Sequence, residues 1–347
     1  MAKNNRKFRI ALDAMGSDYA PESEVRGAIL AFEALKNEID IEIIYAGNET
    51  EINKILTGIT PRDFKYSILH ADEVVTMDDE PTVALKRKRN SSMFKGLELQ
   101  AQGNADAFVS AGNTGAVLAT STVVLGKIEG VSRPTIGAFL PSREGTPVLV
   151  VDVGANVECK PKFLYEFAVM GSICANEVLG IKNPKVGLLN IGEEETKGNE
   201  LTLATYPLLK NSNLNFIGNV EGRDVLKGEA NVVVCDGFVG NIVLKFAESM
   251  PIFFKAQFEH HQVTGLYQNL KLRAAQSTLR EVSLPLDSQE SGGVPLLGVA
   301  GNVIIGHGNS TPKAIKSMIM QAVTLIQNEI NKKIESALKQ TDDSKQS

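Results

Sequence analysis

The sequence predicts an α/β fold, with a mixed, mostly parallel sheet between two helical layers and a helical hairpin projecting from it. Short β-branched runs alternate with helix-period segments along most of the 347 residues, which is typical of βαβ crossovers. Gly-rich turns follow the strands. The stretch from 239 to about 283 is helical in pattern and contains no strand, which predicts the hairpin.

The first part of the chain alternates strands and helices. Residues 8–12 are a predicted strand, and 22–36 a predicted helix because its apolar residues share one face. Residues 107–126 are uncharged and long enough to resemble a membrane span, but their polar side chains and glycines favour a buried strand, loop and helix. The other predicted strands here are 41–46, 66–71 and 107–111, and the other helices are 49–57, 81–101 and 115–126.

Two adjacent strands in the middle, 135–140 and 147–153, are joined only by PSREGT, which predicts an antiparallel hairpin. We expect one α/β domain over 1–338, a hairpin arm over about 243–283, and a polar, frayed tail over 339–347. The remaining predicted strands are 185–191, 216–220, 231–236 and 302–307, and the remaining helices are 161–180, 199–210 and 312–337.

Composition bounds the environment and the partners. A net charge of −5 argues against a general nucleic-acid binder, which usually carries a basic face. Three cysteines without a CxxC spacing predict reduced thiols in a cytosol. The basic N-terminus is followed by Asp13 and Asp18 rather than an apolar segment, so we expect no signal peptide and a soluble protein.

Gly-rich loops follow successive predicted strands and carry Asp, Asn, Thr or His side chains. In an open α/β sheet, ligands bind at the carboxyl ends of strands, where helix N-termini and exposed backbone N–H groups attract anions. Either these glycines only end strands, or together they form a phosphate site, which we favour. The loops are 13–18, 112–116, 153–156, 192–199, 237–241 and 307–311.

The usual nucleotide and metal motifs are missing. No G-x-G-x-x-G or G-x-x-x-x-G-K-[ST] follows a strand, which disfavours NAD and ATP. No H-E-x-x-H motif or Cys/His cluster occurs, and no G-x-S-x-G elbow is present. We therefore expect no cofactor and no metal, and a reaction in which bound phosphate itself is the nucleophile.

His307 and Lys197 are candidate catalytic residues. His307 stands between two glycines at a strand end, where it either satisfies local backbone groups or handles a proton or an oxyanion. Lys197 lies in the acidic loop GEEETKGN, where it either neutralises phosphate or pairs with a neighbouring glutamate.

Two surface features are candidates for binding a partner. Lys86 to Arg89 is a run of four cations on a predicted helix, either a solvated face or a dock for an anion or an acidic protein. The predicted hairpin is apolar and rich in aromatics, which favours dimerisation, contact of its tip with an anionic membrane, or both. The hairpin residues singled out are Phe253, Phe254, Leu266 and Tyr267.

An ordered set of motifs between about 8 and 330 resembles the PlsX family of phosphate acyltransferases. Ser17 and Ser249 stand where that family usually has Gly. The motifs are DAMGSDYAP (13–21), KRKRNSSM (86–93), SAGNTGA (110–116), DVGAN (152–156), NIGEEETKGN (190–199), EGRD (221–224), CDGFVGN (235–241), GGVPLLGV (292–299) and GHGNS (306–310).

This resemblance implies a fold like isocitrate and isopropylmalate dehydrogenases, a homodimer, and peripheral membrane association. It implies attack of inorganic phosphate on the thioester of acyl-acyl carrier protein. The acyl phosphate product would feed a membrane glycerol-3-phosphate acyltransferase in bacterial phospholipid synthesis.

The resemblance and the residue patterns together assign roles to site residues. Proposed catalytic residues are His307, Lys197, Asn241 and Asn113; Arg87 and Lys88 are proposed for docking of the carrier protein or of an anion. Proposed substrate and phosphate-binding residues are Asp13, Gly16, Gly112, Thr114, Gly115, Asp152, Asn156, Asp236, Gly240 and Gly308.

Three alternatives stay open. A short-chain phosphate acyltransferase acting on acyl-CoA would share the phosphate chemistry but need a site for adenosine. A dehydrogenase of the same fold is disfavoured by the absent nucleotide motif. A non-catalytic scaffold for lipid-synthesis enzymes would use the hairpin alone.

Overall fold

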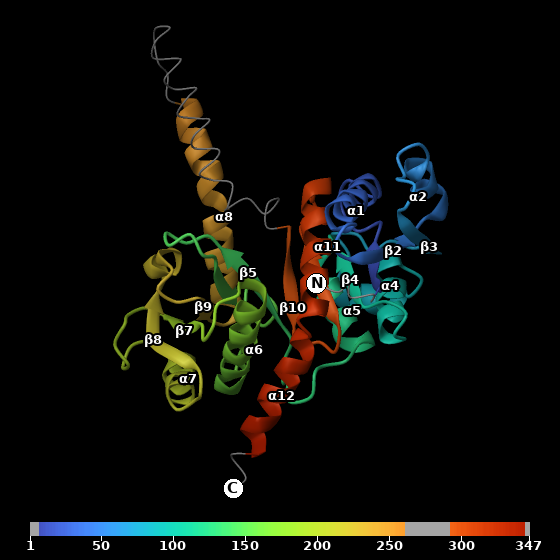
Figure 1. The fold of residues 1–347 in the computed structure, drawn as a ribbon. Helices are drawn as coiled ribbons and strands as arrows, with labels where there is room; N and C mark the ends of the chain where they lie inside the picture. The colour runs from blue at the N-terminus through green and yellow to red at the C-terminus, as the bar shows by residue number, and fades with distance from the viewer. Residues whose placement is uncertain (1–6, 261–291, 344–347) are drawn as a thin grey trace.

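The computed structural model describes residues 7–260 and 292–343 (Figure 1). Its centre is an 11-stranded sheet in the order β3-β2-β1-β4-β11-β10-β5-β6-β9-β7-β8. Helices cover both faces, so the predicted three-layer α/β/α class with a mixed sheet is confirmed. The strands are β1 (Lys7–Asp13), β2 (Asp40–Gly47), β3 (Lys65–His70), β4 (Ala107–Ser110), β5 (Thr135–Leu140), β6 (Val148–Val151), β7 (Lys185–Asn190), β8 (Asn215–Glu221), β9 (Val232–Val234), β10 (Gly293–Leu297) and β11 (Asn302–Gly306).

The sheet consists of two parallel blocks that run in opposite directions. β3, β2, β1, β4 and β11 are parallel to one another, as are β6, β9, β7 and β8. Between the blocks, β10 pairs antiparallel with β11 and β5, and β5 pairs antiparallel with β6 as the predicted hairpin. The carboxyl ends of the two blocks therefore face opposite edges of the sheet.

Helices pack on each face because alternate strand residues point to opposite sides. Ile10 and Leu12 of β1 belong to one apolar cluster, and Ala11 between them belongs to the other. The first cluster includes residues of α1 (Glu22–Leu35), α2 (Glu49–Leu56), α6 (Pro161–Leu179), α7 (Glu200–Lys210), α11 (Pro312–Gln327) and α12 (Ile330–Asp343). The second includes residues of α3 (Pro81–Arg87), α4 (Ser92–Ala101), α5 (Thr114–Val124), the 3₁₀ helix η1 (Gly222–Lys227) and α8 (Gly237–His260).

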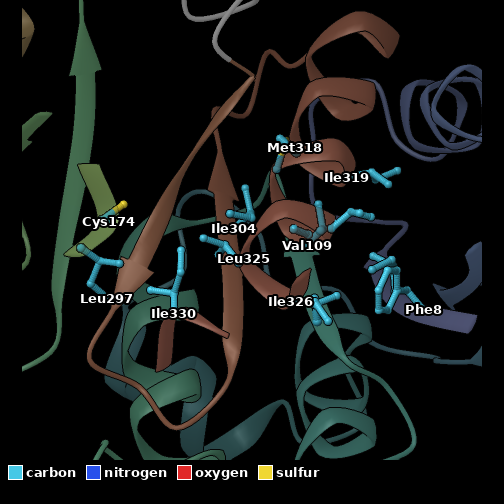
Figure 2. Close-up of a cluster of buried hydrophobic side chains, with 14 of the residues drawn as sticks. Phe8, Val109, Cys174, Leu297, Ile304, Met318, Ile319, Leu325, Ile326 and Ile330 are labelled. Carbon is cyan, nitrogen blue, oxygen red and sulfur yellow. The ribbon is translucent and has the colours of Figure 1, made fainter. Parts of the chain in front are cut away.

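Figure 2 shows the first cluster at the centre of the molecule. Met318 and Leu325 of α11 lie against Ile304 of β11, and Ile330 of α12 lies near Leu297 of β10. All five side chains are buried, and full burial of such a side chain stabilises the fold by about 2 kcal/mol. This packing holds β10 and β11, and with them the loop that carries His307.

Two predicted helices are each broken into two. The helix predicted over 81–101 is α3 and α4, because Ser91 leaves the helical conformation and its hydroxyl caps α4 by accepting from the Phe94 N–H. The helix predicted over 312–337 ends at Asn328, and Glu329 adopts a positive φ of 49° before α12 begins. The predicted start of the tail at 339 is also too early, because α12 continues to Asp343.

β10 was not predicted. Its sequence, GVPLL, carries Gly293 and Pro295, residue types that are depleted in strands. β10 is antiparallel to both β11 and β5, so β5 runs in the same direction as the first block, and the reversal to the second block occurs between β5 and β6.

The segment predicted as the first arm of the hairpin forms the helix α8, and the predicted second arm lies outside the described residues. α8 is continuous over 24 residues and extends beyond the sheet in Figure 1. The uncharged run 107–126 forms β4 and the helix α5, as predicted.

Candidate active site

The loops after β1 and β4 are joined through a buried acid. Asp13 ends β1, is fully buried, and accepts a hydrogen bond of 2.7 Å from the Ser110 hydroxyl at the end of β4. Burial raises the pKa of Asp13, and hydrogen bonds from Ser92 and Ser110 oppose that rise. Asp13 therefore holds two loops together rather than presenting a free carboxylate to a ligand.

The two loops approach so closely that only glycine fits between them. A Cβ on Gly16 would lie 2.7 Å from Asp13 Oδ2 and 3.0 Å from the Gly112 backbone nitrogen. The loop after β11 joins them, because the Asp18 N–H donates to the Gly308 carbonyl at 2.7 Å. Three of the predicted Gly-rich loops thus form one surface at the carboxyl edge of the first block.

Asn113 fastens this surface to a fourth loop. Its side-chain oxygen caps α5 by accepting from the Ala116 N–H, and its amide nitrogen donates to the carbonyls of Thr76, Met77 and Asp79. Both ends of the side chain are therefore engaged inside the protein. Thr114 and Gly115 follow as the first turn of α5, with Thr114 exposed.

His307 meets two charged side chains of α8. Its Nε2 lies 3.6 Å from Glu248 Oε1, and Lys245 Nζ donates to the other Glu248 oxygen at 2.8 Å. Burial lowers the pKa of His307 below its usual range, Glu248 opposes that change, and Lys245 adds to it. The imidazole is therefore neutral at neutral pH and able to accept a proton.

Lys245 and Glu248 were missed by the sequence analysis. With Asn241 they stand at positions i, i+4 and i+7 of α8, a spacing that places side chains on one helix face. The helix after Asn241 was predicted, so its polar face could have been found from the i, i+4 and i+7 spacing. We call Asn241, Lys245 and Glu248 the polar stripe of α8.

The other predicted acids hold the loops of the second block. Asp152 is buried and accepts from the N–H groups of Gly154 and Ala155 and from the Asn156 side chain at 2.7–2.9 Å, and burial raises its pKa. Asp236 caps α8 by accepting from the Val239 N–H.

Gly240 lets α8 begin directly against this loop. A Cβ on Gly240 would lie 1.8 Å from the Asp152 carbonyl oxygen. The side chain of Asn241, the next residue, lies beside Gly154, because a Cβ placed on Gly154 would stand 3.5 Å from Asn241 Cγ. The first turn of α8 is therefore fixed to the loop after β6.

The six Gly-rich loops, which were expected to form one phosphate site together, lie in two groups of three, because the two blocks of strands run in opposite directions. α8 connects them, because Asn241 lies beside the loop after β6 and Glu248 lies beside the loop after β11. Seven residues of helix separate these two positions, a rise of about 10 Å. Parts of both groups therefore border the polar stripe.

Three predicted cations lie elsewhere. Lys197 is exposed in the loop after β7, and Glu193 and Glu195 beside it pair with Arg223 and Lys210. No interaction of the described residues joins the Lys197 side chain to His307. Lys88 points inward to the Val74 carbonyl and the Asp79 carboxylate, whereas Arg87 is exposed at the end of α3.

α8 carries exposed apolar residues on the side that does not pack on the sheet. Phe253 and Phe254 form an edge-to-face pair with ring centroids 5.7 Å apart, and their exposed fractions are 58% and 41%. Leu266 and Tyr267 lie outside the described residues. In the part of the chain that the structure describes, Gly237–Gln257 is the one helix long and apolar enough to cross a membrane by length and composition.

The cysteine thiols are not activated nucleophiles. Burial raises the pKa of Cys159 and Cys174 to about 12 and that of Cys235 well above its usual range, so all three stay protonated at neutral pH. Across residues 7–260 and 292–343, no group of three or more His, Cys, Asp or Glu side chains is arranged to hold a metal ion.

Comparison with known proteins decides the family. Residues 8–333 match the family described as "Fatty acid synthesis protein". The chain belongs to this family. A relative from Dictyoglomus turgidum is 46% identical over 328 residues, covering 94% of this chain and 96% of the relative, and one from Nostoc sp. is 45% identical over 330 residues, covering 94% and 95%. Both are named phosphate acyltransferase, which confirms the PlsX resemblance and the expectation of an acyltransferase enzyme.

Solved structures agree on the fold. A phosphotransacetylase from Streptococcus pyogenes superposes with a TM-score of 0.59 at 19% identity, covering 93% of this chain and 94% of that one. A branched-chain phosphotransacylase from Enterococcus faecalis superposes with a TM-score of 0.51 at 15% identity, covering 91% and 98%.

Proposed function

We propose that this enzyme transfers a long-chain fatty acyl group from acyl carrier protein to inorganic phosphate, producing an acyl phosphate and free carrier protein. The observation that carries the proposal is the placement of His307 and Lys245 beside the Gly-rich loops of the first block. The names of the relatives support phosphate as the acyl acceptor.

Phosphate binding rests on backbone N–H groups and one cation. The first turn of α5 has N–H groups without helical partners, and the helix dipole favours an anion there. Lys245 supplies positive charge beside His307. The residues Gly16, Gly112 and Gly308 keep the loops close enough for one small anion to contact several of them.

The reaction needs one proton transfer. Neutral His307 accepts the proton of hydrogen phosphate as a phosphate oxygen attacks the thioester carbonyl carbon. The tetrahedral intermediate collapses, the carbon–sulfur bond breaks, and the leaving thiolate takes the proton from the imidazolium. The products are acyl phosphate and the carrier thiol, so atoms and charge balance without a cofactor or a metal.

Asn241 is our candidate for the oxyanion. It is exposed on the polar stripe of α8, and its amide can donate to the oxygen that gains charge in the intermediate. Asn113, the other amide predicted for this role, instead holds the loop that contains Thr76 and Asp79. Asp13, Asp152 and Asp236 act by fixing loops. For Lys197 we propose a role in binding phosphate or the carrier protein at the loops of the second block.

Partners and location follow from the same proposal. The exposed apolar residues of α8 support a homodimer and peripheral contact with an anionic membrane from the cytoplasmic side. A membrane glycerol-3-phosphate acyltransferase would then consume the acyl phosphate, and no nucleic acid takes part.

Hydroxylamine trapping tests the function. The purified protein is mixed with acyl-acyl carrier protein and phosphate, and acyl hydroxamate is measured. We expect hydroxamate that depends on phosphate and forms more slowly from acyl-CoA. Faster reaction with short-chain acyl-CoA would favour the alternative substrate. No hydroxamate, together with intact co-sedimentation with lipid, would favour the scaffold.

A further inference from the structure

The basic run does not act as a unit, because its four cations have different surroundings. Lys88 is turned inward and paired with Asp79. Lys86, Arg87 and Arg89 are exposed, and no ion pair joins them to a carboxylate within residues 7–260 and 292–343. Three neighbouring cations without a carboxylate partner stand out on a chain with a net charge of −5.

Two of these cations line a groove between α3, α4 and α5. Its cavity volume is about 440 Å³, and its walls include Leu85, Phe94, Val123 and Val124. The Arg89 guanidinium lies over the Phe94 ring, 5.8 Å from its centroid, so an apolar surface orients this charge. The lining residues Lys86 and Arg89 are accompanied by one carboxylate, that of Glu98. Val123 is 64% exposed.

The groove is connected to the candidate active site by the helices that form it. α5 begins with Thr114 directly after the Gly112 loop, and α3 begins with Pro81, whose ring packs against Gly115. Val123 lies nine residues after Thr114, a distance of about 13 Å along the helix. A protein seated in the groove therefore lies within one short helix of the proposed phosphate site.

We propose that the groove lined by Lys86, Arg89 and Val123 docks the acidic carrier protein, with the thioester arm running along the seam of α3 and α5. This rests on the proposed function. Two unpaired cations beside an exposed apolar side chain fit a partner surface that is acidic with an apolar centre. The docking role predicted for Arg87 and Lys88 moves to their neighbours, because Lys88 is paired with Asp79 and Arg87 does not line the groove.

Charge reversal tests the proposal. The double variant Lys86→Glu/Arg89→Glu is compared with Lys54→Glu/Arg62→Glu, which reverses two exposed cations away from the groove. Steady-state rates are measured with acyl-acyl carrier protein and with the same acyl group on free pantetheine. We expect KM for the carrier protein to rise about tenfold or more in the groove variant, and KM for the pantetheine thioester to stay unchanged. The control pair should change neither.

Further readouts separate the outcomes. High salt should reduce the difference between wild type and the groove variant, because it screens exposed charges. An unchanged carrier-protein KM would overturn the docking site, and loss of binding to anionic vesicles with that KM unchanged would assign the groove to a membrane. A wild-type enzyme that consumes neither thioester would instead refute the proposed function.

Discussion

At the scale of single residues, the charge state of His307 is set by its burial and by the neighbouring charges of Glu248 and Lys245. Burial keeps the pKa of His307 below its usual range, while the negative charge of Glu248 raises this pKa and so partly offsets the effect of burial. Replacing Glu248 with Gln removes the raising influence, so the pKa of His307 should fall further. A base with a lower pKa stays deprotonated to lower pH. The acid limb of the kcat/KM profile should therefore move to lower pH in Glu248→Gln.

The profile is measured with acyl-acyl carrier protein at saturating phosphate. Lys54→Gln serves as a control for a surface substitution, because Lys54 is exposed on α2. A limb that stays in place, or moves to higher pH, would show that His307 is not the titrating base.

Glu24 should make stability depend on pH. It is fully buried, and burial raises the pKa of Glu24 to about 7, while the neighbouring Ser17 opposes the rise. An acid whose pKa is higher in the folded state stabilises the fold below its unfolded pKa. That contribution is lost as pH rises through the folded value. The free energy of unfolding of wild type should therefore fall by about 3 kcal/mol relative to that of Glu24→Gln between pH 4.5 and pH 7.

Urea denaturation of both proteins across this pH range measures the difference. Glu22→Gln, an exposed change in the same helix, controls for the general effect of removing a carboxylate. A constant gap in the free energy of unfolding between wild type and Glu24→Gln would contradict the prediction.

Several residue roles could be predicted from sequence and others could not. His307 stood out because two glycines flank it at a strand end, and the structure gives it charged neighbours. Lys88 and Asn113 are engaged by Asp79 and the 76–79 loop, contacts between segments that no spacing rule connects. Lys245 was not predicted, although its i, i+4 spacing from Asn241 places both side chains on one face of α8.

At the scale of elements, the start of α8 depends on Gly240. Any Cβ there would lie 1.8 Å from the Asp152 carbonyl oxygen, which is backbone and cannot turn aside. Gly240→Ala should therefore lower the free energy of unfolding by about 3 kcal/mol, because the helix must shift away from the loop. Gly222→Ala provides the matched control, since a Cβ there meets nothing within 4 Å.

Chemical denaturation compares the two variants with wild type. Because the shift would also move Asn241 and Lys245, Gly240→Ala should lose activity under conditions where it remains folded. Equal stability of the two alanine variants would refute the close contact.

Most elements were predictable because their signals are local. The β5–β6 hairpin was predicted from its short connection, and its antiparallel pairing is confirmed. The breaks at Ser91 and Glu329 were missed, since the apolar periodicity continues across each of them. β10 was missed because its Gly and Pro are depleted in strands, and they are tolerated here by pairing with β11, which follows directly, and with β5, which lies far earlier in the sequence.

At the scale of the whole molecule, the strands of the two blocks of the sheet run in opposite directions, and α8 connects the loops of one block to those of the other. The fold class followed from alternation of strands and helices, but the relative direction of the two blocks depends on which strands are neighbours in the sheet, and local patterns do not show that order. The candidate site could therefore be predicted as a set of loops, but not as two groups bridged by a helix.

The proposed chemistry depends most directly on His307 as the proton acceptor. The decisive measurement is the rate of acyl hydroxamate formation from acyl-acyl carrier protein and phosphate by His307→Gln, with folding checked by circular dichroism. Loss of a positioned general base typically lowers turnover by about 10²–10⁴-fold. We predict a fall in kcat within that range. A folded His307→Gln enzyme with turnover near that of wild type would contradict this role for His307.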